Sequence, residues 1–141
     1  MSETSSPGDG AGSPTVPGGD VYDWFQRGRQ LLTERHPDAA ATLLARAADA
    51  EPGSRSIREA LARAQYDAGR YADAIDSFTV LIADDPADDY AHFGLGLAAD
   101  KAGELVLAAE HLALAVAMRP DQPHYGRALR GVRARIARNP A

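Results

Sequence analysis

The sequence repeats itself every 34 residues, and this period constrains the fold more than any other feature of the chain. Small residues, large apolar residues and prolines each recur at this spacing without an insertion. The five columns are Gly28, Ala62 and Gly96; Ala40, Ala74 and Ala108; Leu44, Phe78 and Leu112; Ala47, Leu81 and Ala115; and Pro52, Pro86 and Pro120. Columns in one register predict three copies of one unit, stacked so that neighbours bury a shared core.

The residue types in these columns predict pairs of antiparallel helices. Small residues let two helices approach closely, and each proline ends a second helix because it lacks an N–H. Gly69 and Gly103 are expected to turn the chain within a pair, and Arg35, His36 and Pro37 take that place in the first pair. The expected helices cover residues 21–34, 37–50, 55–68, 71–84, 89–102 and 105–118.

The segments outside the repeats differ from each other. Residues 1–19 are rich in Ser, Gly and Pro and are expected to be a disordered tail. A seventh helix is expected at 123–138, where Tyr125, Leu129, Val132 and Ile136 form one stripe at helical spacing. It is predicted to cap the last pair. The expected domain therefore covers 20–138, with repeats at about 21–54, 55–88 and 89–122 and the cap at 123–138.

Composition excludes several classes of protein. There is no cysteine, so a thiol nucleophile and a zinc–cysteine site are excluded. Residues 1–20 lack the basic region and apolar run of a secretory signal, and no stretch approaches the roughly 18 apolar residues of a membrane span. We therefore expect a cytoplasmic protein without membrane contact. No Ser–His–acid arrangement is evident, so neither an enzyme nor a cofactor is expected.

The repeats resemble those of the tetratricopeptide repeat family. That family's pattern has Leu-Gly in the first helix, a small residue at the turn, then Ala, an aromatic or Leu, Ala and a closing Pro. The third repeat matches it with Leu95, Gly96, Gly103, Ala108, Leu112, Ala115 and Pro120. The resemblance implies an all-α, right-handed superhelical solenoid of three repeats and a capping helix. It also implies a concave groove that binds a peptide or helix of a partner protein.

Carried over by position, the resemblance implies a groove lined by the first helix of each pair. The residues placed there are Tyr22, Phe25, Arg29, Glu59, Arg63, Tyr66, Tyr90, Phe93, Leu97 and Lys101. Exposed aromatic residues are typical binding anchors, and two arginines at one repeat position are suited to a partner carboxylate. We therefore expect a partner segment with apolar anchors and an acidic residue. The alternative is that Arg63 pairs with Glu59 and Asp67 while the aromatic residues pack together.

One subset of the family grips the C-terminal carboxylate of chaperones with lysine, asparagine and arginine. The matching places here hold Phe25, Arg29, Ala60, Tyr90 and Gly94. Because only one of these five is basic, a chaperone co-factor of that kind is not expected.

Two other functions stay open. The chain is a candidate for self-association through the cap helix or the groove, since Gly126 and Gly131 weaken that helix by about 1 kcal/mol each. The cap also carries a predicted arginine face, formed by Arg127, Arg130, Arg133, Arg135 and Arg138. Contact with nucleic acid through it is disfavoured, because the net charge is −5 and no aromatic residues interleave the arginines.

Three further patterns in the sequence have a structural interpretation as well as a binding one. Gly94 lies outside the close-approach column, so it either leaves room for a ligand's backbone or is simply tolerated. Aspartates around Pro86 lack the glycine and terminal glutamate of a calcium loop, so they are expected to form a solvated turn in which Asp88 or Asp89 caps the next helix. His92 and His111 fall at core-facing places, where packed or hydrogen-bonded side chains are expected.

Overall fold

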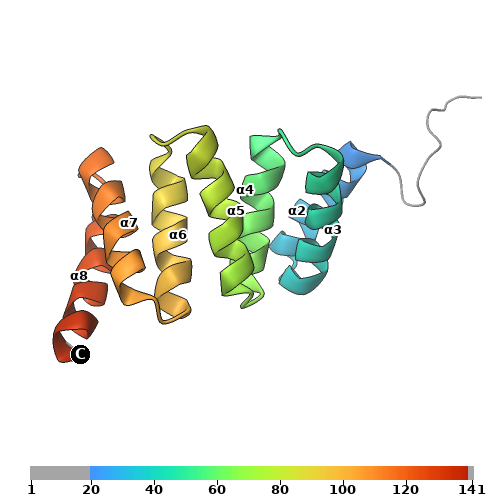
Figure 1. Ribbon diagram of the computed structural model, residues 1–141. Coiled ribbons are helices and arrows are strands. Elements are labelled where there is room, and N and C mark those ends of the chain that lie inside the picture. The colour runs from blue at the N-terminus through green and yellow to red at the C-terminus, as the bar shows by residue number, and fades with distance from the viewer. Residues whose placement is uncertain (1–19, 140–141) are drawn as a thin grey trace, which may run out of the picture.

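The computed structural model describes residues 20–139, and they form seven α-helices whose antiparallel pairs stack one after another along the chain (Figure 1). The expected tail at 1–19 lies outside the described residues. The helices are α2 (Val21–Thr33), α3 (Pro37–Ala50), α4 (Arg55–Asp67), α5 (Tyr71–Asp84), α6 (Asp89–Lys101), α7 (Leu105–Met118) and α8 (Pro123–Arg138). The all-α superhelix is confirmed, and the first helix of each pair ends one residue earlier than predicted. No helix within 20–139 is both long and apolar enough to cross a membrane.

Capping side chains explain where the first helix of each pair begins. The N-cap residues Asp20, Ser54 and Asp88 each accept a hydrogen bond from a backbone N–H three residues further on. Such a cap is worth about 1 kcal/mol relative to alanine. The prediction that Asp88 or Asp89 caps α6 is therefore confirmed for Asp88.

Within each pair the chain turns through a residue with left-handed backbone. Gly69 and Gly103 have φ of 78° and 83°, as predicted. In the first pair Arg35 takes this conformation, with φ of 66°. The N–H of His36 then donates to the carbonyl of Leu31 at 2.8 Å, the bond that closes a Schellman turn.

The glycine column lets a leucine of the second helix lie directly on the backbone of the first. A Cβ on Gly28 would lie 2.6 Å from Cγ of Leu44, and a Cβ on Gly96 would lie 2.6 Å from Cγ of Leu112. Real Cβ atoms do not approach this closely, so both positions require glycine unless the leucine moves.

The second pair has different residues at the glycine and leucine columns. Ala62 occupies the glycine column, and Phe78 occupies the leucine column. The ring of Phe78 lies against the next pair at Gly94, where a Cβ would be 2.3 Å from the ring's Cζ. Gly94 is thus a close-approach residue for Phe78. The alternative that it leaves room for a ligand's backbone is wrong, because the ring occupies that space.

The buried apolar side chains form two clusters that meet at α4. The N-terminal cluster comprises Trp24, Ala40, Ala41, Leu44, Ala47, Ala48, Ile57, Leu61 and Ala64. The C-terminal cluster comprises Ala62, Ala74, Phe78, Leu81, Ala91, Leu95, Ala98, Ala99, Ala108, Leu112, Leu129 and Val132. Because α4 contributes to both, it holds the first pair against the rest of the solenoid.

Helix α8 lies against α7 and also contacts α6. Its predicted stripe faces inward: Tyr125, Leu129 and Val132 are buried, and Ile136 is half-buried. Leu129 and Val132 thereby extend the C-terminal cluster beyond the last repeat. The helix packs as a cap on the third pair.

Candidate binding cleft

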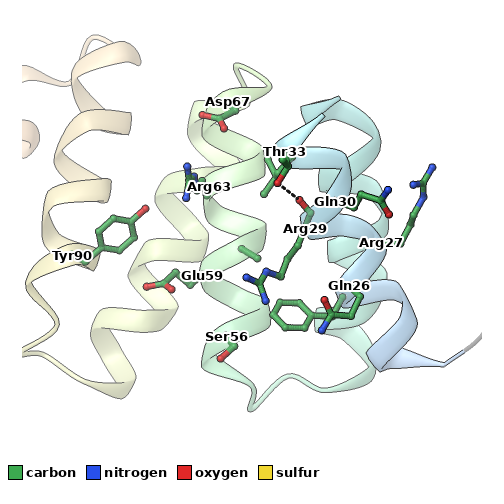
Figure 2. A pocket seen from close by; sticks show the side chains of 13 residues that line it. Gln26, Arg27, Arg29, Gln30, Thr33, Ser56, Glu59, Arg63, Asp67 and Tyr90 are labelled. Atoms are coloured by element: carbon green, nitrogen blue, oxygen red, sulfur yellow. Dashed lines mark hydrogen bonds between the residues drawn. The ribbon is translucent and has the colours of Figure 1, made fainter. Parts of the chain in front are cut away.

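A cleft of about 1100 Å³ lies along the first helices of the pairs, between α2 and α4 and as far as α6 (Figure 2). Its lining is contributed mainly by the first two pairs. The lining residues are Phe25, Gln26, Arg27, Arg29, Gln30, Leu32, Thr33, Ser56, Glu59, Ala60, Arg63, Asp67 and Tyr90. This volume is large for a small-molecule pocket and accommodates several residues of a peptide.

Arg29 and Arg63 are both exposed in this cleft. Within residues 20–139 neither forms an ion pair, so the alternative in which Arg63 pairs with Glu59 and Asp67 does not hold in this structure. The guanidinium of Arg29 lies 5.4 Å from the ring centroid of Phe25, a cation–π contact. Such a contact is worth only about 0.5–1 kcal/mol at an exposed site, so it leaves the guanidinium available to a partner.

Tyr90 closes the cleft on the α6 side. Its ring makes an edge contact with Phe78 at a centroid distance of 6.2 Å, and the side chain remains 37% exposed. Burial raises the pKa of Tyr90, while the positive charge of Arg63 opposes this shift. The phenol is therefore a neutral hydroxyl, and the side chain points from α6 into the cleft (Figure 2).

A small apolar hollow opens beside the cleft between α4 and α6. Its volume is about 60 Å³, and it shares Arg63 and Tyr90 with the cleft. The residues that line this hollow are Arg63, Tyr66, Phe78, Tyr90, Phe93, Gly94 and Leu97. Burial raises the pKa of Tyr66, and the nearby Tyr71 and Asp100 add to the shift.

The structure divides the ten residues that were predicted to line the groove. Phe25, Arg29, Glu59, Arg63 and Tyr90 come together around the cleft. Tyr66, Phe93 and Leu97 lie at the hollow. Tyr22 and Lys101 are exposed but line neither.

Phe93 was expected to be an exposed anchor, and this is wrong. Its ring stacks on Tyr125 of the cap at 4.5 Å and meets His124 edge-on at 5.2 Å. The side chain is half-buried against the C-terminal cluster. The cap helix therefore covers much of the aromatic surface that the third repeat would otherwise present.

Two polar contacts also tie the cap to α6. The hydroxyl of Tyr125 donates to Asp89 at 2.6 Å, and Arg135 forms an ion pair with Asp100. Burial and the hydrogen bond to Asp89 raise the pKa of Tyr125. The predicted arginine face accordingly loses Arg135, which turns toward α6.

The four remaining arginines of that face are exposed. They are Arg127, Arg130, Arg133 and Arg138. The face is therefore smaller than predicted, and it lies on the outer side of the last helix.

The aspartates around Pro86 have partners within the chain. Asp84 and Asp88 both form ion pairs with Arg55, the former at 2.6 Å. Arg55 begins α4, so this contact ties the second pair to the start of the third. Asp85 accepts the N–H of Ala87 at 3.1 Å.

The two core-facing histidines form a hydrogen bond with each other, and this pairing was not predicted. Nδ1 of His92 lies 2.9 Å from Nδ1 of His111, and Nε2 of His92 lies 2.9 Å from the carbonyl oxygen of Pro86. Their rings are stacked at 5.1 Å. The expectation of packed, hydrogen-bonded core histidines is confirmed, and the pair joins α6 to α7.

Gln26, Leu32, Ser56 and Ala60 also line the cleft, and the same carry-over by position places them in the groove. The four other lining residues, Arg27, Gln30, Thr33 and Asp67, were not predicted to lie there. Gln30 and Thr33 follow Gln26 and Arg29 by one helical turn, so helical spacing along α2 was a signal that would have found them.

The model of one family, the tetratricopeptide repeat, matches residues 25–89 and again residues 60–123. The chain belongs to the tetratricopeptide repeat family. Together the two matches span most of the described helices, from α2 to the start of α8. No curated protein matches the sequence.

Solved structures of this family have the same fold. The chain superposes on MamA of Desulfovibrio magneticus RS-1 with a TM-score of 0.78 and 23% identity, covering 82% of this chain and 66% of that one. It spans just under two thirds of that relative. The first tetratricopeptide domain of human RPAP3 gives a TM-score of 0.75 and 17% identity, covering 83% of this chain and 92% of that one. At these identities the likeness shows the fold alone.

Proposed function

We propose that this tetratricopeptide repeat protein is a non-enzymatic adaptor that holds a segment of another protein in the cleft between α2 and α4. The observation that carries the proposal is the presence, in a cleft of about 1100 Å³, of two exposed arginines that form no ion pair with any residue of 20–139. An extended peptide fits an elongated cleft of this kind, and a carboxylate suits the planar fork of each guanidinium.

The chemistry of the cleft selects the partner. Phe25 and Tyr90 supply aromatic surface to it, and Arg29 and Arg63 supply positive charge. Glu59 also lies in the cleft and disfavours a second carboxylate beside it. The proposed partner segment is therefore mainly apolar and carries one or two acidic residues.

A structural relative that binds a peptide supports the proposal. The first tetratricopeptide domain of Spaghetti (RPAP3) is bound to the HSP90 peptide SRMEEVD, and this chain matches it with a TM-score of 0.77 and 17% identity over 89% of this chain and 99% of that one. That peptide combines acidic and apolar residues. The five clamp places carried over from the chaperone-binding subset hold only one basic residue here, Arg29, so we propose a different sequence as the ligand.

Affinity capture tests the proposal. Immobilised wild type and an Arg29→Ala/Arg63→Ala variant are incubated with extract of the native cell, and bound proteins are identified. The variant is expected to lose the partner while keeping its helix content, because exposed substitutions change stability by under about 0.5 kcal/mol each. The matched control is Arg130→Ala/Arg133→Ala, which removes the same charge from the outer face of α8. Loss of the partner with the control alone would contradict the cleft and favour the arginine face.

Self-association is the second candidate function. Val80 and Leu114 stand at the same repeat position on α5 and α7, and they are 45% and 44% exposed. Val106, on α7, is 68% exposed. Exposed apolar side chains on these two helices suit contact with another copy. Sedimentation of wild type beside Val106→Lys/Leu114→Lys tests it: a concentration-dependent increase in mass that the variant abolishes would support this function.

A further inference from the structure

The hollow beside the cleft is built by one local exchange of side chains. Gly94 contributes no side chain to it, and the ring of Phe78 lies against the Gly94 backbone as part of its wall. Tyr66 and Leu97 stand at its other sides. In the first and third pairs a leucine packs on a glycine of its own pair, whereas Phe78 of the second pair packs on Gly94 of the third.

The size of the hollow limits what enters it. Its volume of about 60 Å³ is well below the roughly 150 Å³ of a cavity that holds benzene. An aromatic ring is therefore too large, whereas the end of an unbranched or singly branched aliphatic side chain fits. Phe78, Phe93 and Leu97 give the hollow apolar walls, and its polar side-chain groups come from Arg63 and from the hydroxyls of Tyr66 and Tyr90.

The rim supplies the second element of recognition. Arg63 belongs to both the hollow and the cleft, and it forms no ion pair within residues 20–139. A group seated in the hollow thus places a neighbouring carboxylate beside the guanidinium of Arg63. The two requirements are met by adjacent parts of one ligand.

We infer that the hollow is the specificity subsite of the cleft, and that it takes a leucine- or methionine-sized side chain of a partner segment whose neighbouring carboxylate pairs with Arg63. This inference rests on the proposed cleft function and deepens it. The hollow would select an aliphatic over an aromatic side chain at one position of the partner segment, whereas the larger cleft accepts both.

Small probes test the subsite on the full chain. N-acetyl-leucine carries both elements, N-acetylglycine lacks the side chain, N-acetyl-leucinamide lacks the carboxylate, and N-acetylphenylalanine has an oversized ring. Each is titrated into isotope-labelled protein while the amide signals of Gly94, Leu97 and Arg29 are followed. N-acetyl-leucine is expected to shift Gly94 and Leu97 saturably, with a dissociation constant on the order of millimolar. N-acetylglycine is expected to bind about tenfold more weakly or worse.

Variants locate the effect. Leu97→Phe fills the hollow from its wall and is expected to abolish the Gly94 response to N-acetyl-leucine. Leu32→Phe makes the same change in the cleft away from the hollow and should preserve the response. The probe series on wild type decides the matter by itself if Leu97→Phe fails to fold, as circular dichroism would show.

Several results would overturn the inference. One is an absent Gly94 response, and another is an equal response to N-acetylglycine or N-acetylphenylalanine. Shifts at Arg29 without shifts at Gly94 would also overturn it, while leaving the cleft function in place. Conversely, a saturable Gly94 response together with partner capture that is insensitive to Arg29→Ala/Arg63→Ala would uphold the subsite and remove the proposed adaptor function.

Discussion

The groove-facing surface of the first helices is open at the N-terminal end of the solenoid and covered at the C-terminal end. At the N-terminal end, α2 and α4 border an open, largely polar cleft, and the guanidinium of Arg29 lies over the ring of Phe25. At the C-terminal end, α8 lies against α6, and Phe93 is stacked on Tyr125. The Asp89–Tyr125 and Asp100–Arg135 contacts reinforce that closure.

This difference shows that a repeat position does not have one fixed use. Phe25 and Phe93 are both aromatic residues of a first helix that faces the groove by its place in the repeat. One remains in the cleft, and the other becomes part of the cap interface because Tyr125 of α8 stacks on it. The available binding surface is consequently concentrated over the first two pairs and ends at the hollow.

Removing the cap is expected to produce the largest effect. A chain that ends at Pro120 loses the contacts of Tyr125, Leu129 and Val132, all buried in the intact protein. Since solenoid stability is approximately a sum of neighbour interfaces, the free energy of unfolding should fall by several kcal/mol, or the exposed apolar surface should cause association. Urea unfolding and sedimentation measure both. An equally stable, monomeric truncated chain would show that α8 is dispensable and that the closed end is not what stabilises the third pair.

Gly94→Ala tests the junction between the two ends. The new Cβ would lie 2.3 Å from the ring of Phe78, a buried side chain that cannot easily move, so we expect a loss of about 1–3 kcal/mol. In a chain carrying Phe78→Leu the same change should be neutral or stabilising, since alanine is favoured over glycine in a helix by about 1 kcal/mol. The control is Gly126→Ala, whose Cβ meets only the flexible end of Arg130 at 3.3 Å. Equal effects of Gly94→Ala in both backgrounds would contradict the pairing with Phe78.

The ion pair between Arg135 and Asp100 is expected to contribute less. Both side chains are partly exposed, at 39% and 23%, so Arg135→Ala should lower the free energy of unfolding by at most about 1 kcal/mol. Arg133→Ala, two residues away and exposed, is the matched control and should change stability by under about 0.5 kcal/mol. Thermal unfolding of both variants and of Asp100→Asn, alone and combined with Arg135→Ala, isolates the pairwise energy. Additive effects would mean that the two side chains do not interact.

The fold was predictable because its determinants lie in one register of the sequence. The columns of glycine, leucine and proline predicted the helices, and the residues of the caps and turns predicted where they begin and end. The burial of Phe93 was not predictable in this way, because its partners Tyr125 and His124 lie in a segment outside the repeat register. The role of Gly94 was also missed, although one signal was present: Phe78 departs from the leucine column.

The smallest expected effect is a loss of stability at the His92–His111 contact, which occurs only as pH falls. A carbonyl oxygen only accepts, so Nε2 of His92 donates to Pro86, and Nδ1 of His92 then accepts from Nδ1 of His111. Burial, reinforced by His92, lowers the pKa of His111 from its ordinary value of 6.5, although Glu110 opposes the shift. The unfolded chain therefore binds a proton more readily, so stability is full above about pH 6.5 and declines as pH falls through the folded pKa.

The decline is small because a protonated His111 keeps its Nδ1–H bond and its partly exposed ring reaches solvent. Thermal unfolding of wild type and His111→Asn between pH 7.5 and 5.5 measures the difference in slope. A variant whose melting temperature falls with pH as steeply as that of wild type would place the pH sensitivity elsewhere in the protein.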